Sequence, residues 1–383
     1  MSDLHSCAWN VMVSANKRTE LKYRNVHPAL KCCLGCKQKV VDRSIRQKIK
    51  KQTTLLEIMS DDYEGFQFQS IADLTFLPQS DFVVASEFAT VNHPNGRVTV
   101  FGQKGEVKIT FPPQDRGKDI TLYGVTSIGN SDEHVAICTG DGVSVWTVDG
   151  RIVSYLTHAT VHNCCHVASL KNGLLATTCM TEYEDRLVTI WDPRNGRITS
   201  QFGSRPKVLE VNPLKQLQRI LVRDKDIRLP WFIAADSELN VHISDRTSQC
   251  VKVFDSRNGR YERRYDVAGV NNRCRKGSLL PQGICMDEDD NAFVVNDLTN
   301  TVAIFDKHGE HVRDLSMEES SPKESKMWSL ALSKYDKVQF PQSVLVRNQM
   351  ISPARKIALS MSRRKPQAFV YNLSFCKHYS IGF

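Results

Sequence analysis

One short stretch of the chain combines side chains suited to binding a nucleic acid. Asn271, Asn272, Arg273, Arg275 and Lys276 lie within six consecutive residues. Lys and Arg neutralise phosphates, and amide groups can hydrogen-bond to the edges of unpaired bases. The stretch therefore indicates binding of single-stranded RNA.

Further cations and one aromatic residue are candidates for the same surface, because planar side chains can stack on splayed bases. We expect one face to combine the first cluster with a second set: Tyr183, Arg186, Arg246, Arg363, Arg364 and Lys365. A structural alternative is open for Arg246 and for the runs of charged residues. Arg246 follows Asp245 and can instead make a hydrogen bond between neighbouring repeats, and runs of charge are commonly solvated surface.

No catalytic or metal-binding pattern emerges. The sequence has no Gly-rich phosphate loop, nucleophile elbow or HExxH motif. His158, His162 and His166 recur every four residues, but they fall across a loop and a strand, where this spacing does not align side chains. Cys33 and Cys36 have the spacing of a zinc-ligand pair, and no second pair follows. We predict no enzyme activity, no metal, no cofactor and no small-molecule substrate.

The elements that would position the candidate residues are repeated antiparallel sheets. In residues 280–315, short apolar and alternating runs separated by turns predict four strands. The third strand and its turn, VAIFDKHG, recur along the chain with an aromatic residue at a fixed place. These aromatic anchors are Phe101, Trp146, Trp191, Phe254, Phe305 and Tyr371, separated by 45, 45, 63, 51 and 66 residues. Spacings of roughly 40–50 residues are typical of propeller blades, so six blades are expected.

The blades are expected near residues 66–111, 122–156, 165–202, 231–266, 280–315 and 328–383. In such a blade, the loop between the second and third strands emerges on the same face as the connection to the next blade. Propellers bind partners with loops at the rim of the central channel. We expect the candidate residues to gather on this face.

Two blades carry a family resemblance. PQGICMDEDDNAFVVNDLTNTVAIFD, residues 281–306, resembles an NHL repeat, the blade unit of the six-bladed β-propeller in the TRIM-NHL family. NVHISDRTSQCVKVFDSRNGRYERRYD, residues 240–266, resembles a second copy. A WD-repeat propeller is the alternative suggested by Trp191 and Asp192, but the expected Gly-His pair is missing. The resemblance implies an all-β, six-bladed NHL-type propeller that binds single-stranded RNA and represses messenger RNA. No RING cysteine ladder precedes it, so ubiquitin-ligase activity by itself is not expected.

Residues 1–62 lie outside the repeats and carry +6 of the net charge of +9, which leaves +3 for residues 63–383. Apolar residues from Val41 to Met59 recur at steps of three and four, which predicts a helix. It is either an amphipathic helix that packs on the propeller or a coiled-coil remnant. We therefore predict two domains, a basic and partly helical segment over 1–62 and a propeller over 63–383.

The modest charge of residues 63–383 leaves a second function open. A propeller that binds proteins, as a scaffold or as a substrate adaptor including for ubiquitination, needs no basic face. The loop cluster and the family resemblance favour RNA, and the charge favours a protein partner.

The sequence also predicts a compartment. It shows no secretory signal at its start and no apolar run of about 18 residues, so we expect a cytoplasmic protein that does not enter a membrane. Twelve cysteines are then expected to be reduced. Cys138, Cys179, Cys250 and Cys285 lie in or beside apolar strands and are expected to pack as small hydrophobic residues.

Overall fold

The computed structural model describes residues 71–80, 82–88, 96–102, 106–111, 122–140, 142–159, 161, 163–180, 186–204, 226–270, 279–316, 326–332, 350–351, 355–362, 367–373 and 376–377. All of them belong to one compact unit, Leu55–Phe383. The described residues form strands and turns and contain no helix. The predicted segment 1–62, with its helix, lies outside them.

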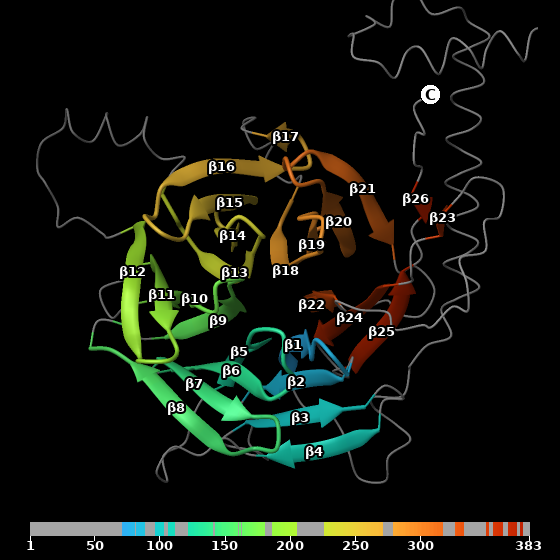
Figure 1. Cartoon of the computed structure of the whole chain (residues 1–383). Coiled ribbons are helices and arrows are strands. Elements are labelled where there is room, and N and C mark those ends of the chain that lie inside the picture. The colour runs from blue at the N-terminus through green and yellow to red at the C-terminus, as the bar shows by residue number, and fades with distance from the viewer. Residues whose placement is uncertain are drawn as a thin grey trace, which may run out of the picture. The chain divides into compact units, whose positions relative to one another are not determined.

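Five antiparallel sheets of at least four strands are arranged around a centre (Figure 1). Blade 1 consists of β1 (Ile71–Phe76), β2 (Val83–Glu87), β3 (Arg97–Phe101) and β4 (Val107–Phe111). Blade 2 consists of β5 (Leu122–Ser127), β6 (His134–Thr139), β7 (Gly142–Thr147) and β8 (Ile152–Thr157). Blade 3 consists of β9 (Cys164–Ser169), β10 (Leu175–Met180), β11 (Arg186–Asp192) and β12 (Arg197–Ser204).

Blade 4 has a fifth strand at its outer edge. It consists of β13 (Pro230–Ala235), β14 (Asn240–Asp245), β15 (Cys250–Asp255), β16 (Tyr261–Asp266) and β17 (Gly269–Val270). Blade 5 consists of β18 (Pro281–Met286), β19 (Ala292–Asn296), β20 (Thr301–Phe305) and β21 (His311–Ser316). In every blade the strands follow one another in sequence, each hydrogen-bonded to the next.

The expected sixth four-stranded blade is not found in the described residues, so the prediction of six such blades is wrong. The last sheet has three strands, β22 (Lys326–Leu332), β24 (Arg355–Ser362) and β25 (Gln367–Leu373). A separate pair joins β23 (Met350–Ile351) to β26 (Cys376–Lys377). The repeat around Tyr371 departs from the pattern of the other blades, because it lacks the turn Gly and the Asp after the aromatic residue.

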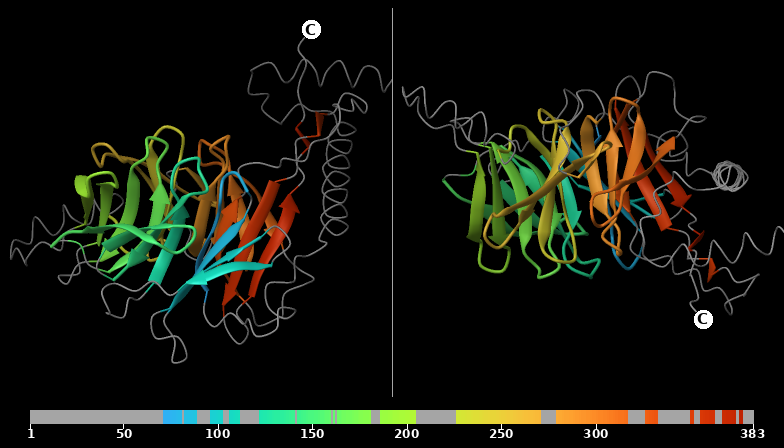
Figure 2. Two further views of the ribbon diagram at one scale, coloured as in Figure 1. Left: turned by 60° about the horizontal axis from the view of Figure 1, so that its bottom comes forward. Right: turned by 90° about the horizontal axis from the view of Figure 1, so that it is seen from above.

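The three-stranded sheet nevertheless completes a ring of inner strands. Each inner strand, β1, β5, β9, β13 and β18, contacts the next one along the chain, and β22 contacts both β18 and β1. The side views in Figure 2 show the sheets standing next to one another around this ring. An architecture of twisted sheets packed face to face around an axis is a β-propeller.

The aromatic anchors explain how each blade is built. Phe101, Trp146, Trp191, Phe254 and Phe305 are all buried at or next to the end of the third strand, as predicted. In each of the five blades the pairing of the third with the fourth strand shifts register immediately before the anchor. A β-bulge bends and twists a strand locally. The bulge therefore recurs in all five blades, next to the buried aromatic side chain of the third strand.

Neighbouring blades are joined by hydrophobic packing and by a repeated hydrogen bond. Near the end of the second strand, a hydroxyl donates to a carbonyl of the next blade's inner strand: Ser86 to Tyr123, Thr178 to Trp231, and Ser244 to Gln282, at 2.6–3.0 Å. These hydroxyls are buried and paired, which avoids the cost of an unsatisfied polar group. Each such bond fixes the offset between two blades.

Candidate functional site

The structure confirms which loops share a face. The loop after the second strand of blade 4 bonds to the chain entering the same blade, through Arg246 N–H and Leu229 O at 3.2 Å. Blade 5 repeats this contact between Asp297 N–H and Leu280 O at 3.0 Å. Loops between second and third strands and connections between blades therefore meet on one face, which we call the loop face.

In blades 4 and 5, one side chain of the second strand binds the segment that leads into the first strand of the same blade. The Asp245 carboxylate accepts hydrogen bonds from the backbone N–H groups of Arg228 and Leu229, and the Asn296 side-chain oxygen accepts one from Leu280. Asp245 and Asn296 occupy the same last position of the second strand, β14 and β19. This shared function explains why a short polar side chain ends the second strand in both of these blades.

A buried ion pair reinforces this arrangement in blade 4. Lys252 donates to Asp245 at 2.8 Å and to Ser248 at 2.9 Å, and both charged side chains are almost completely buried. Burial opposes the charge of Asp245, but Lys252 and the backbone donors outweigh it and lower the pKa of this carboxyl. Sequence reasoning missed the pair, because a Lys within the apolar strand VKVFD reads as an outward-facing residue.

Arg246 is the most informative of the predicted RNA-binding residues. Its Nη2 donates to Asp297 Oδ2 at 3.1 Å, which bridges the loops of blades 4 and 5. Its side chain is 34% exposed and that of Asp297 is 9% exposed. The structural alternative, a bond between repeats, is the one that the geometry supports. In blade 1, Arg97 is likewise paired with Glu87 on this face.

Leu298 lies immediately beyond this bridge and is 52% exposed. Its backbone N–H donates to Asn296 Oδ1 at 3.2 Å, and Asn300 closes the turn with a left-handed φ of 53°. The turn is thus held by defined hydrogen bonds, with an apolar side chain presented to solvent. Single exposed apolar side chains are common on protein surfaces, but a Leu next to an Arg and a polar rim matches the composition of protein interfaces.

The remaining predicted residues are not brought together within the described part of the chain. Arg186 is half-buried and begins β11, opposite Met180 and Ser204. The other predicted residues lie outside the described residues: Tyr183, Asn271, Asn272, Arg273, Arg275, Lys276, Arg363, Arg364 and Lys365. Cys33 and Cys36 also lie outside them.

The centre of the ring contains a polar contact that sequence reasoning did not find. The Asp73 carboxylate accepts hydrogen bonds from Val125 N–H at 3.0 Å and from the Ser329 hydroxyl, and His166 Nδ1 lies 3.4 Å away. The His166 ring stacks on Phe232 with centroids 3.6 Å apart. These residues come from β1, β5, β9, β13 and β22 and are buried, so they tie the inner strands together.

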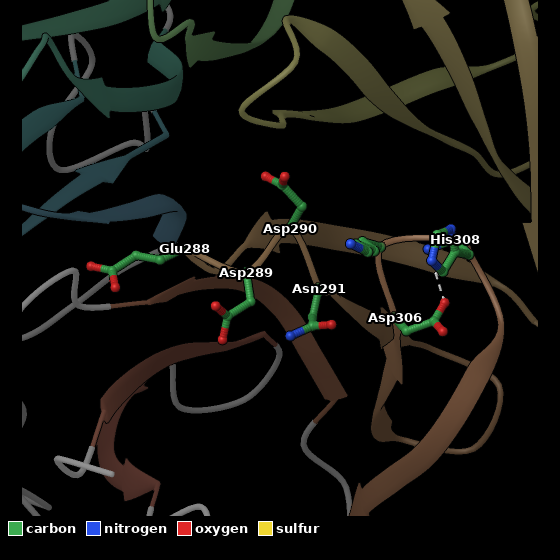
Figure 3. A pocket seen from close by; sticks show the side chains of 7 residues that line it. Glu288, Asp289, Asp290, Asn291, Asp306 and His308 are labelled. Carbon is green, nitrogen blue, oxygen red and sulfur yellow. Dashed lines mark hydrogen bonds between the residues drawn. The ribbon is translucent and has the colours of Figure 1, made fainter. Parts of the chain in front are cut away.

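An acidic pocket of about 550 Å³ lies at turns of blade 5 on the other face (Figure 3). It is lined by Glu288, Asp289, Asp290, Asn291, Asp306, Lys307 and His308. Several carboxylates are already used: Asp290 accepts from the Ser237 N–H and hydroxyl at 2.8 and 2.6 Å, and Asp306 accepts from His308 N–H. Among the described residues no group of three His, Cys, Asp or Glu side chains could hold a metal.

The arginines on that face also have local functions. Arg257 makes a two-pronged contact with Asp255, and Arg194 makes the same contact with Asp192 in blade 3. Arg260 pairs with Glu262. These contacts close the turns between the third and fourth strands and explain the repeated sequence Asp-x-Arg-Asn-Gly.

Comparison with known proteins agrees with the fold. The sequence matches no protein-family model and no curated protein sequence, so the resemblance to NHL repeats and the TRIM-NHL family has no support there. Solved structures do match. A calcium-binding protein, regucalcin, from Agrobacterium tumefaciens is 11% identical, with a TM-score of 0.53 over 82% of this chain and 93% of that one.

Two enzymes share the fold at a similar level. A gluconolactonase from Xanthomonas campestris is 13% identical, with a TM-score of 0.50 over 80% of this chain and 87% of that one. A catalytically inactive virginiamycin B lyase from Staphylococcus aureus with quinupristin is 12% identical, with a TM-score of 0.50 over 80% of this chain and 96% of that one.

These enzymes correct one expectation. We expected no enzyme activity, but propellers of this architecture include a lactonase and a lyase, so the fold gives no ground for that exclusion. None of the three proteins described above is named as an RNA-binding protein. Within the described residues no helix has the length and hydropathy to cross a membrane. At these identities the comparisons establish one property of the chain, its β-propeller fold.

Proposed function

We propose that the chain is a protein-interaction propeller that binds a partner peptide on its loop face, at the junction of blades 4 and 5. The observation that carries the proposal is the exposed Leu298 beside the Arg246–Asp297 bridge. An apolar partner side chain would cover Leu298. A carboxylate or backbone carbonyl of the partner would accept from the exposed part of the Arg246 guanidinium, which has five N–H donors.

The pairing of Arg246 and Arg97 with carboxylates supports a protein partner over RNA. Arg246 and Arg97 are each engaged by a carboxylate that lies close to the loop face. A phosphate would have to compete with these carboxylates, whose charge also repels it. A mixed surface with an exposed apolar side chain suits a peptide better, because protein interfaces combine apolar anchors with a polar rim.

The test is a selection of random peptides on the intact chain, followed by affinity measurements with Leu298→Asp. Covering a Leu side chain contributes about 1.5–3 kcal/mol, so the substitution is expected to weaken selected peptides by about tenfold or more. Val312→Asp is the matched control, because Val312 is 58% exposed on the outer strand β21 of the same blade. It should leave peptide binding unchanged.

A parallel selection of short RNAs separates the two functions. Peptides that bind both variants equally well would contradict the proposal. An enriched RNA motif whose affinity falls as salt rises, and falls again after Arg273, Arg275 and Lys276 are changed to Ala, would establish RNA recognition in its place.

A further inference from the structure

Three thiols meet in the interior of the packing between blades 2 and 3. Cys138 lies on β6, Cys164 on β9 and Cys179 on β10, and all three are completely buried. They share one hydrophobic cluster with Trp191 and Leu175. The expectation that Cys138 and Cys179 pack as small hydrophobic residues is confirmed, but Cys164 was not singled out from the sequence.

Cys164 and Cys179 are direct partners across antiparallel strands. They face each other in the register of β9 and β10, next to a shift in pairing that leaves Cys165 unpaired with β10. Their sulfur atoms are 3.0 Å apart, closer than two unbonded sulfur atoms normally approach. Opposed residues in antiparallel strands have Cα atoms about 4.5–5.5 Å apart, which lies within the range that a disulfide spans.

We propose that Cys164 and Cys179 form a site of reversible disulfide modification within blade 3. Oxidation forms one S–S bond and breaks two S–H bonds, and two electrons and two protons pass to the oxidant. An azo compound such as diamide accepts them and becomes a hydrazine. A small-molecule disulfide accepts them through a mixed disulfide and is released as two thiols.

Cys164 is the shared member of the thiol group. Its thiol lies within hydrogen-bonding reach of Cys138 as well as Cys179. Cys138, however, belongs to the neighbouring blade, and only Cys179 is opposite Cys164 in a strand pair. The geometry therefore selects the bond within blade 3 over a bond between blades.

Burial makes the reaction slow in the native state. The hydrogen bond with Cys138 and burial raise the pKa of Cys164, and burial together with the bond to Cys164 raises the pKa of Cys179. Because the thiolate is the reactive form, both groups should react more slowly than exposed thiols, and faster as pH rises. The pair would then respond to sustained oxidation and not to a brief exposure.

The test treats the intact, reduced chain with diamide under native conditions, and then blocks the remaining thiols with N-ethylmaleimide in acidic denaturant. Peptide mapping without reduction is expected to recover a peptide pair joined through Cys164 and Cys179, with fragment ions that distinguish Cys164 from Cys165. The oxidised chain should melt about 5 °C higher, because a bridge restricts the unfolded state. Dithiothreitol should reverse both changes.

Cysteine variants distinguish the Cys164–Cys179 disulfide from disulfides that involve the nearby cysteines. Cys165→Ser should keep the linked peptide, and Cys164→Ala or Cys179→Ala should remove it. The peptide map of the oxidised wild-type chain tests the proposal by itself, even if a substitution prevents folding. Recovery of Cys164 and Cys179 as blocked thiols after other cysteines have been oxidised would overturn the proposal. A dominant link between Cys138 and Cys164 would overturn it as well.

Discussion

At the scale of single residues, the structure depends on buried polar side chains that satisfy one another. In blade 4, His242 Nε2 lies 3.2 Å from Asp236 Oδ2, and His242 Nδ1 lies 3.0 Å from the Tyr265 hydroxyl. Asp236 also accepts two hydrogen bonds from Asn240. Burial lowers the pKa of His242 and outweighs the opposing effect of Asp236, so the imidazole is neutral at pH 7.

This histidine predicts a pH dependence of stability. Its folded-state pKa is below the unfolded value of 6.5, so the unfolded chain binds a proton more readily. The contribution of His242 is complete above pH 6.5 and is lost as the pH falls toward the folded-state pKa. Denaturant unfolding of the wild type between pH 8 and 5 should show this loss, with a slope from this residue of at most about 1.4 kcal/mol per pH unit.

His242→Gln is the comparison for that measurement. All other histidines are present in both proteins, so the difference between the two curves isolates this site. The difference between the free energies of unfolding of the two proteins should shrink as the pH falls below 6.5. Parallel curves over the whole range would show that His242 titrates alike in the folded and unfolded states. Arg263 and Asp290 act on its pKa in opposite directions, and both remain in the variant.

At the scale of elements, neighbouring blades contact each other through their turns as well as through their sheets. The turn between the third and fourth strands of blade 5 packs against the outer strand of blade 4. A Cβ added to Gly309 would come within 2.9 Å of the Tyr265 ring. The equivalent Gly259 meets Phe202, and Gly150 meets Phe111. A glycine and an aromatic residue therefore form a repeated contact between consecutive blades.

Two glycine substitutions isolate this contact. Gly309 and Gly173 have nearly the same backbone conformation, with φ of 87° and 83°, but nothing lies within 4 Å of a Cβ at Gly173. Gly173→Ala should cost about 1–2 kcal/mol for the left-handed conformation alone. Gly309→Ala should cost about 1–3 kcal/mol more, because Tyr265 is buried and bonded to His242 and has no space to move. Equal unfolding midpoints for the two variants would refute the packing contribution.

At the scale of the whole molecule, the ring is closed by residues distant in sequence. β22 joins β18 and β1, and the Ser329 hydroxyl donates to Asp73, 256 positions away. Asp73 also bonds to β5 and lies beside His166 of β9. One carboxylate thus links the first strand of the propeller to its last inner strand, and the ends of the ring should unfold together.

Asp73→Ala tests this linkage. It leaves the buried N–H of Val125 and the Ser329 hydroxyl without their acceptor, at a cost of about 1–3 kcal/mol for each group. We expect the free energy of unfolding to fall by about 2–5 kcal/mol in a single transition. Asp314→Ala, which removes a carboxylate from a partly exposed pair with His311, should change it by less than about 1 kcal/mol.

A double-mutant cycle identifies the closing contact itself. If Asp73 and Ser329 act on each other, the cost of Asp73→Ala combined with Ser329→Ala should be less than the sum of the two single costs. Additive costs would mean that the last sheet contributes to stability independently of β1.

The sequence by itself determined the repeat, the aromatic anchors and the boundaries of blades 2 to 5, because these depend on local alternation and on turns within about ten residues. It also predicted that loops after second strands share a face with the connections between blades. It overestimated the last blade, where the turn Gly and the Asp are missing. A local sequence pattern does not show which residue a side chain will contact, and the roles of the residues described above depend on those contacts.

Tertiary structure alone decided those partners. It brought Arg246 to Asp297 in the next blade and Asp73 to Ser329 across the closure of the ring. Within single blades, the pairing of strands placed Lys252 beside Asp245 and Cys164 opposite Cys179. A charge that reads as a free cation in the sequence becomes part of an ion pair when the next blade supplies a carboxylate. The position of one blade relative to the next is set by packing between whole sheets. Contacts between residues more than fifty positions apart therefore cannot be predicted from local sequence spacing.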